Sequence, residues 1–253
     1  MRRSKTVLPV LLAACCLTTG MFVAPPDLYA VFPYLTDVLV YDFNRTAETP
    51  ITGPSAQGYS WSNPVQSGQS GAKTNGTQMV ENGATQNGSY MTTLLDETQE
   101  TIFDYGGTFG SGVLSIYARV QNPGNPSTMN CYGMNTTGGN FFAWKFINGS
   151  GPNYFNGGSA ICNVNFGAVG LDKLGMYVTG ANPTSVEIWY HGASGWAQCG
   201  TTLSDSGLTP STNVVGSGYS GVEFDTTVTA TVDNWTVGGL PSGRLRMLMG
   251  VGQ

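Results

Sequence analysis

The sequence predicts an all-β fold, a two-sheet antiparallel jelly-roll β-sandwich with a short apolar extension at each end. Glycine accounts for 36 of the 253 residues, and glycine tolerates the positive φ angles that hairpin turns need. Charged residues make up only 10% of the chain, against roughly 25% in an average soluble domain. The 40% of hydrophobic residues is enough to form a core and argues against disorder. These features favour short strands joined by many turns.

Runs of β-branched and aromatic residues between turn signals predict the strands. They are residues 36–43, 90–95, 112–120, 140–147, 171–179, 185–191, 197–203, 218–224 and 227–237. The Gly-, Ser- and Gln-rich stretch 53–88 is predicted to be a surface loop. The jelly roll therefore spans residues 36–239, between an N-terminal segment, residues 1–35, and a C-terminal tail, residues 240–253.

Alternation within these strands predicts which side chains face the core. In residues 227–237, strict alternation places Trp235 on the face of Asp233, opposite Val232 and Asn234. We expect this last strand to pair with the first one, because the two end strands of a jelly roll usually do. Phe43 and Trp235 would then stabilise the pairing from within the core.

Charge is unevenly distributed along the chain. Five of the ten basic residues lie at the two ends, whereas all fifteen acidic residues lie between Asp27 and Asp233. The body is therefore acidic, which excludes nucleic acid as a partner, since phosphate binding needs a basic surface.

The N-terminal segment has two competing interpretations. Residues 1–5 contain three basic side chains and residues 7–24 are almost wholly apolar, as in a secretory signal. Leu12-Ala13-Ala14-Cys15 resembles the lipobox of bacterial lipoproteins, in which the cysteine is lipidated. The alternative is an apolar arm that stays attached and docks on partner subunits. A membrane span is less favoured, because Pro9 and Gly20 interrupt the run.

Three stretches of the body resemble the concanavalin A-like lectin/glucanase superfamily, including its laminin-G-like jelly rolls. They are Asp42-Phe43-Asn44-Arg45 followed by Trp61, the strand at 186–190, and the two closing segments 218–224 and 232–238. The resemblance implies a jelly roll of the kind found in phage virion proteins and in secreted bacterial proteins. It specifies the fold more than an activity.

Carboxylates near the two end strands are candidate calcium ligands. Ca²⁺ prefers several oxygen ligands, and Asp37 or Asp42 would join Asp233 if the end strands pair. The structural alternative is that Asp233 and Asn234 cap turns or bind backbone groups. We expect no other cofactor.

The sequence lacks a recognisable catalytic motif. Retaining glucanases of this superfamily carry an E-x-D-x-x-E strand, whose carboxylates act as nucleophile and acid/base, and no such motif is present. The acidic cluster of residues 96–100 is predicted to be a solvated turn. His191 is the sole histidine, which excludes multi-histidine zinc sites. The chain is therefore predicted not to be an enzyme.

Aromatic residues are the candidate glycan-binding groups, because flat rings can stack on sugar rings. Trp189, His191 and Trp196 lie on or beside one predicted hairpin, and Tyr59 and Trp61 form a second set. The alternative for each tryptophan is packing in the core.

The body contains three cysteines, Cys131, Cys162 and Cys199, whose spacing does not fit a metal site. In an exported protein one pair would form a disulfide, whereas in a protein made in the cytosol all three would be buried thiols. The odd number favours buried thiols.

The tail after the last predicted strand is basic and apolar. Its side chains would not be left in water, so we expect it to dock on its own domain or on a neighbour through Arg244, Leu245, Arg246, Met247 and Leu248.

The sequence thus favours a non-enzymatic structural or decoration protein on the surface of a phage capsid or tail. Its partners would be other copies or other virion proteins, held through the termini, and host-cell glycans. The alternative is an exported bacterial lipoprotein, anchored at the membrane, with a carbohydrate-binding jelly roll. A glycoside hydrolase is a third, disfavoured hypothesis.

Overall fold

The computed structural model describes residues 32–35, 38–53, 59–83, 86–107, 112–207, 213–225 and 228–239. The N-terminal segment up to residue 31, including Cys15, lies outside the described residues. So do Asp37 and the docking tail with Arg244, Leu245, Arg246, Met247 and Leu248. None of the described helices is long and apolar enough to span a membrane.

The described chain is almost entirely β-structure. Its strands are β1 (Val38–Tyr41), β2 (Trp61–Ser62), β3 (Lys73–Thr74), β4 (Met79–Val80), β5 (Gln86–Met91), β6 (Gln99–Gly106), β7 (Leu114–Gln121), β8 (Asn130–Thr137), β9 (Asn140–Ile147), β10 (Ser150–Tyr154), β11 (Cys162–Asn163), β12 (Lys173–Thr179), β13 (Ser185–Gly192), β14 (Gly195–Gln198), β15 (Leu203–Ser204), β16 (Tyr219–Asp225) and β17 (Thr231–Gly238). Two short helical turns, α1 (Phe166–Val169) and η1 (Asp205–Gly207), complete it.

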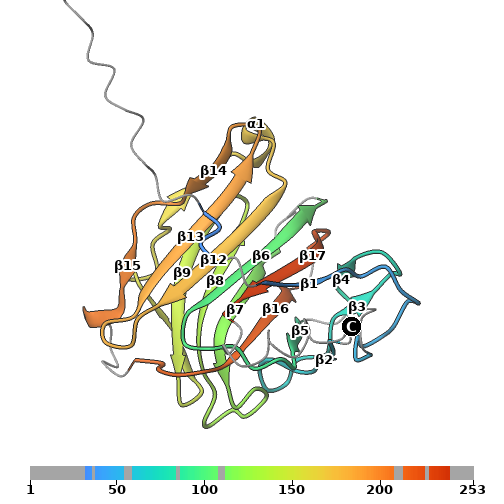
Figure 1. Ribbon diagram of the computed structural model, residues 1–253, viewed down its shortest axis with the longest axis horizontal. Coiled ribbons are helices and arrows are strands. Elements are labelled where there is room, and N and C mark those ends of the chain that lie inside the picture. The colour runs from blue at the N-terminus through green and yellow to red at the C-terminus, as the bar shows by residue number, and fades with distance from the viewer. Residues whose placement is uncertain are drawn as a thin grey trace, which may run out of the picture. The chain divides into compact units, whose positions relative to one another are not determined.

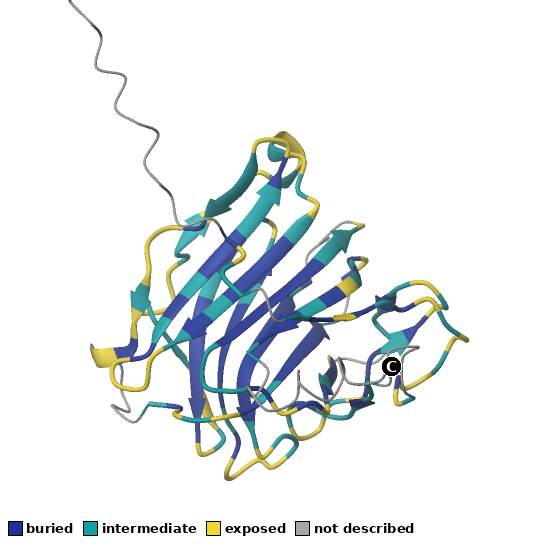
Figure 2. Cartoon of the chain, viewed as in Figure 1, coloured by how far each residue is buried: buried dark blue, intermediate teal, exposed yellow. Residues whose placement is uncertain are grey.

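The strands form two antiparallel sheets, which confirms the predicted sandwich (Figure 1). The first sheet has the order β14-β13-β12-β6-β17-β4-β3, with β1 beside β17 and β15 beside β13. The second has the order β10-β9-β8-β7-β16-β5-β2, with β11 beside β9. Figure 2 shows that buried residues follow the central strands, whereas exposed ones lie mainly in the connections.

The two end strands pair, as expected from the sequence. Tyr41 of β1 lies opposite Trp235 of β17, and both side chains are fully buried, as is Phe43. Trp61 packs against Trp235 with ring centroids 5.6 Å apart. This aromatic cluster anchors the pairing between the inner faces of the sheets.

A β-bulge overturns the predicted alternation of the last strand. The register of β17 against β6 shifts between Asp233 and Thr236, and Asn234 adopts a φ of 44°. One extra residue therefore separates the two halves of the strand. Val232 and Trp235 consequently face the same core, although strict alternation placed them on opposite faces.

The stretch 53–88 is not simply a surface loop, contrary to the prediction. It contains β2, β3, β4 and the start of β5, and Val65, Ala72 and Met79 are buried in it. The prediction failed because two-residue strands carry too little periodicity to be recognised. The prediction also omitted β6, β8 and β10.

A buried arginine ties together the loops at one end of the sandwich. Arg119 lies at a bulge of β7 with a φ of 51°, and its side chain is fully buried. The guanidinium donates to the carbonyls of Glu97 (2.6 Å), Val214 (2.8 Å) and Gly180 (2.8 Å). Burial lowers the pKa of Arg119. The planar guanidinium of one residue therefore holds three separate loops in place through hydrogen bonds.

One disulfide joins the ends of two short strands. Cys162 of β11 is bonded to Cys199, which follows β14, whereas Cys131 is a buried free thiol. The expectation of three buried thiols is therefore wrong for Cys162 and Cys199. Their spacing in the sequence gave no indication of a contact, because the folding of both sheets brings them together.

Candidate functional site

The structure brings the first predicted glycan-binding set together on the outer face of the first sheet. Trp189 and His191 of β13 lie beside Trp196 of β14, with the rings of His191 and Trp196 5.1 Å apart. Phe32, however, stacks on Trp189 at 5.0 Å and meets Trp196 edge-on at 4.6 Å. Only 8% of Trp189 is exposed. The chain itself therefore occupies the ring face that a sugar would need.

The covering segment, residues 32–35, is hereafter called the N-terminal strap. The Tyr34 amide donates to Glu100 at 2.6 Å, and the Tyr34 hydroxyl donates to Glu187 at 2.9 Å. Phe32 lies over Gly175 of β12, where a Cβ would come within 2.6 Å of its ring. Glu100 is buried, and burial raises its pKa. It is therefore not part of the solvated acidic turn that the sequence predicted.

His191 has an acidic neighbour on this face. Its Nδ1 lies 2.6 Å from the Asp172 carboxylate, at the partly exposed end of β13.

The second predicted glycan-binding set packs in or against the core. Trp61 is only 2% exposed and belongs to the aromatic cluster of the end strands, so its ring offers no face to a ligand. Tyr59 is partly buried and packs against the same core.

The predicted calcium ligands are only partly described. Asp233 lies on the bulge of β17, where its carboxylate accepts from the Asn234 amide at 2.8 Å, which is the structural use weighed above. Asp42 follows β1 directly. No group of three or more His, Cys, Asp or Glu side chains that could hold a metal occurs among the described residues. Because Asp37 lies outside them, the calcium site stays a prediction.

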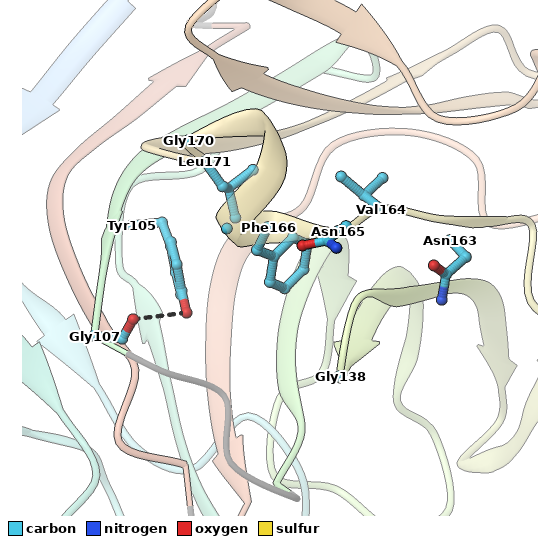
Figure 3. Close-up of a pocket in the computed structure, with 10 residues that line it drawn as sticks. Tyr105, Gly107, Gly138, Asn163, Val164, Asn165, Phe166, Gly170 and Leu171 are labelled. Atoms are coloured by element: carbon cyan, nitrogen blue, oxygen red, sulfur yellow. Dashed lines mark hydrogen bonds between the residues drawn. The ribbon is translucent and has the colours of Figure 1, made fainter.

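A concave site that the sequence did not predict lies elsewhere, at the end of the sandwich that carries α1 (Figures 1 and 3). We call it the Phe166 pocket; its volume is about 760 Å³. It is lined by Tyr105, Gly107, Gly138, Asn163, Val164, Asn165, Phe166, Gly167, Gly170 and Leu171. The size falls within the range of roughly 300–1,000 Å³ that is typical of small-molecule sites.

A capped helical turn forms one wall of the Phe166 pocket. Asn165 is the N-cap of α1, and its Oδ1 accepts from the Ala168 amide at 3.1 Å. Gly170 ends the turn with a φ of 62°. Asparagine and glycine favour these two positions. The turn holds Phe166 between Tyr105 and Phe141, with ring centroids 6.0 Å and 5.7 Å away.

The loop before α1 is fastened to the β8–β9 hairpin and to the first sheet. The Val164 amide donates to the Gly139 carbonyl at 2.8 Å. A Cβ at Gly139 would lie 2.2 Å from the Val164 carbonyl oxygen, so only glycine permits this approach. The disulfide of Cys162 fixes the same loop two residues earlier. The pocket wall is therefore held by a hydrogen bond, a close backbone contact and a covalent cross-link.

The Phe166 pocket offers aromatic and amide groups without charge. No ionised side chain lines it among the described residues. Tyr105 donates from its hydroxyl to the Gly107 carbonyl at 3.1 Å (Figure 3), and burial raises its pKa to about 12. It therefore stays neutral at physiological pH. Such a lining suits an uncharged ligand that combines apolar C–H faces with hydroxyl groups.

Sequence reasoning missed these residues. The local signal was the Asn165-to-Gly170 capping pattern, which predicts a short helical turn. Nothing in the sequence indicated that Tyr105, more than fifty residues away, faces the same cavity.

A second missed group lies on the outer face of the second sheet. Glu223 of β16 is only 6% exposed and accepts hydrogen bonds from the Tyr117 hydroxyl and from Gln66, the latter at 3.1 Å. Burial raises the pKa of Glu223 to about 7. Asp225 lines the same groove. Asp225 lies one residue beyond the predicted strand 218–224, and alternation extended by that residue places both acids on one face.

No protein-family model and no curated protein matches this sequence. Solved structures do resemble it. A Bacillus subtilis protein of unknown function with a galectin-like fold has a TM-score of 0.51 and 9% identity, over 81% of this chain and 97% of that one. The carbohydrate-binding module CBM66 from Bacillus subtilis has a TM-score of 0.41 and 15% identity, over 77% and 96%.

A GH43 glycoside hydrolase engineered for endo-xylanase and exo-arabinofuranosidase activity has a TM-score of 0.41 and 13% identity. The match covers 81% of this chain but only 41% of that one. At these identities the similarity shows the fold alone. Together with the two-sheet topology, the similarity to the galectin-like structure confirms the predicted jelly-roll β-sandwich.

Proposed function

We propose that the protein binds carbohydrate in the Phe166 pocket and does not cleave it. The observation that carries the proposal is the lining of this cavity. Tyr105 and Phe166 border a volume of about 760 Å³ together with the amides Asn163 and Asn165 and several glycines. Aromatic rings suit the C–H faces of a sugar, while amide and backbone groups suit its hydroxyls.

The absence of a carboxylate from this lining supports a binding role. Glycoside hydrolysis needs two carboxyl groups on either side of the scissile bond, and no described lining residue supplies one. Glu223 and Asp225 line a groove on the second sheet instead. Glu100 accepts a hydrogen bond from the N-terminal strap and does not line the pocket. We therefore retain the prediction of a non-enzymatic protein.

The disulfide supports the exported form of this proposal. Disulfides persist mainly in oxidising compartments, and Cys162 and Cys199 are paired. An extracellular lipoprotein, anchored at Cys15, fits this chemistry.

The second candidate is a virion surface protein that uses the same pocket to adhere to host glycans. The apolar N-terminal segment and the basic, apolar tail favour it. Intact mass of the native protein separates the two candidates. Cleavage and lipidation at Cys15 would rule out the virion protein, and an unprocessed N-terminus in symmetric particles would rule out the lipoprotein.

A neutral-glycan array followed by calorimetry tests the pocket. Asn165→Asp keeps the oxygen that caps α1 but removes the amide donor and adds a charge. We expect it to lower the affinity for the best neutral glycan about tenfold, the value of one lost hydrogen bond. Phe166→Leu should weaken binding to a similar extent because it removes the ring.

Asn125→Asp is the matched control. Asn125 accepts from the Ser127 amide at 2.9 Å in an exposed turn before β8, whereas the pocket lies beyond the other end of that strand. This variant should bind like the native protein. Unchanged affinity in both pocket variants would contradict the proposed site, and failure of the native protein to bind any neutral glycan would contradict the proposed function.

A further inference from the structure

The groove on the outer face of the second sheet is built across three neighbouring strands. Glu223 of β16 is paired with Ser115 of β7, which is paired with Asn135 of β8. Directly opposed side chains lie on the same face of a sheet, and neighbouring strands are about 4.8 Å apart. Glu223 and Asn135 therefore flank Ser115 across roughly two strand spacings. The groove has a volume of about 220 Å³.

Aromatic side chains form one wall of this groove. Gly133 of β8 lies between Tyr117 and Trp144 in the sheet register. A Cβ at Gly133 would come within 2.1 Å of the Trp144 ring, so glycine lets the indole lie across the strand. Its ring meets Tyr117 with centroids 5.1 Å apart. Phe146 and Pro152 extend the wall. The polar floor is thus bounded by apolar surface.

The groove is rich in hydrogen-bond acceptors and contains no cation. Glu223 and Asp225 contribute carboxylates, and neither Lys nor Arg is among the described residues that line it. The buried Oδ1 of Asn135 has no hydrogen-bond partner among the described residues. A buried acceptor without a partner is costly. The lining therefore suits a ligand that brings several hydrogen-bond donors and a positive charge.

We propose that this groove is a second ligand site, which binds the protonated amine of an amino sugar between Glu223, Asp225 and Asn135. An ammonium group supplies three N–H donors and one positive charge, and charge-assisted hydrogen bonds are the strongest of their kind. The apolar wall of Trp144 and Tyr117 strengthens this attraction because it excludes water. Acidic sugars are excluded, since the described lining contains no basic side chain that could pair with the carboxylate of such a sugar.

The titratable groups of the groove predict how binding depends on pH. They are Glu223 and Asp225 of β16 and Tyr117 of β7, whereas β5 contributes Gln86 and β8 contributes Asn135. Burial raises the pKa of Glu223 to about 7, so acid protonates it and removes its negative charge. The amine of the sugar loses its proton on the alkaline side. Affinity should therefore be greatest near neutral pH and fall on both sides.

Calorimetry with three probes tests the proposal. They are a β-1,4-linked glucosamine tetramer, its fully N-acetylated counterpart and putrescine. We expect the glucosamine tetramer to bind at pH 7 and the N-acetylated tetramer to bind at least tenfold more weakly at this groove. Putrescine stays protonated to higher pH, so any binding of it should fall only on the acid side.

Variants locate the site. Glu223→Gln, which keeps the acceptor for Tyr117 and Gln66, should lower affinity for the glucosamine tetramer tenfold or more and abolish the acid-side fall. Asn135→Ala should lower it about threefold to tenfold. Asp233→Asn removes an equal charge from the bulge of the first sheet and should leave binding unchanged.

The outcomes separate this site from the Phe166 pocket. Phe166→Leu should not affect binding of the amine, and Glu223→Gln should not affect binding of neutral glycan. Equal binding of the two tetramers by native protein and by Glu223→Gln would overturn the proposal. Binding of putrescine alone would overturn its assignment to a sugar. Displacement of the glucosamine tetramer by Ca²⁺ at low millimolar concentration would identify a metal site instead.

Discussion

Glu223 links the stability of the fold to pH. Its carboxyl group lies among Tyr117, Gln66 and the nearby Asp225, without a basic partner in the groove. Desolvation penalises the charged form, and Asp225 adds repulsion. The pKa of about 7 in the folded protein exceeds the value of 4.5 for a solvated glutamate. Between these two values the folded state therefore binds more protons than the unfolded state.

The free energy of unfolding should consequently fall as pH rises from about 4.5 to about 7 and stay lower above that range. The Glu223 contribution to this fall is on the order of 3 kcal/mol, because one pKa unit corresponds to about 1.4 kcal/mol. Glu223→Gln should remove it and make the protein more stable than the native chain at pH 8. Urea unfolding at pH 5 and pH 8 measures the difference.

Asp233→Asn is the control for the same experiment and should retain the pH dependence of the native protein. If the free energy of unfolding of Glu223→Gln depends on pH as that of the native chain does, the buried carboxyl group of Glu223 is not the source of this pH dependence. Ligand-free protein is used, since a bound amine would favour the charged form of Glu223.

Elements whose pattern is local were predicted well, and those that depend on distant partners were not. The predicted strand 140–147 coincides with β9, because its aromatic residues and flanking glycines give a clear signal. β8 carries Asn130, Gly133 and Asn135, which are poor strand formers. It is a strand because β7 and β9 both pair with it. The intrinsic strand propensity of a residue therefore decides little where the two neighbouring strands supply its backbone hydrogen bonds.

The hairpin between β8 and β9 provides a test at the level of elements. Gly139 has a φ of 91° and faces the Val164 carbonyl oxygen, whereas Gly138, with a φ of 55°, has open space around its Cβ position. Gly139→Ala should destabilise the protein by about 2–4 kcal/mol, through backbone strain and displacement of Val164. Gly138→Ala should cost only about 1–2 kcal/mol, the strain of the left-handed conformation.

Urea unfolding measures both variants, and calorimetry with a neutral glycan measures the pocket. Gly139→Ala should also weaken glycan binding, because Val164 precedes Asn165. Equal stability losses for the two variants would show that the close approach of Gly139 to Val164 does not matter.

At the scale of the whole molecule, the disulfide makes the stability of the fold and the position of the pocket loop depend on the redox state of the compartment. Cys162 and Cys199 are 37 residues apart in sequence, and Cys162 stands just before the loop that carries Asn165 and Phe166. A cross-link of this length stabilises mainly by restricting the unfolded chain. An oxidising compartment therefore favours both the fold and the pocket.

Cys199→Ser should lower the free energy of unfolding by about 2–4 kcal/mol and weaken neutral-glycan binding. Reduction with dithiothreitol should produce the same loss in native protein and no further loss in the variant, as measured by urea unfolding. An equal response of both proteins to the reductant would place the sensitive bond elsewhere in the chain.

By itself the sequence determined the fold class, the pairing of the two end strands and the burial of Phe43 and Trp235. Alternating hydrophobicity, turn residues and aromatic end strands are local patterns, and they survive in the folded chain. Only the tertiary structure decided that Phe32 covers Trp189 and which distant residues line the Phe166 pocket and the Glu223 groove. These contacts arise where strands far apart in sequence become neighbours, and no local pattern encodes that adjacency.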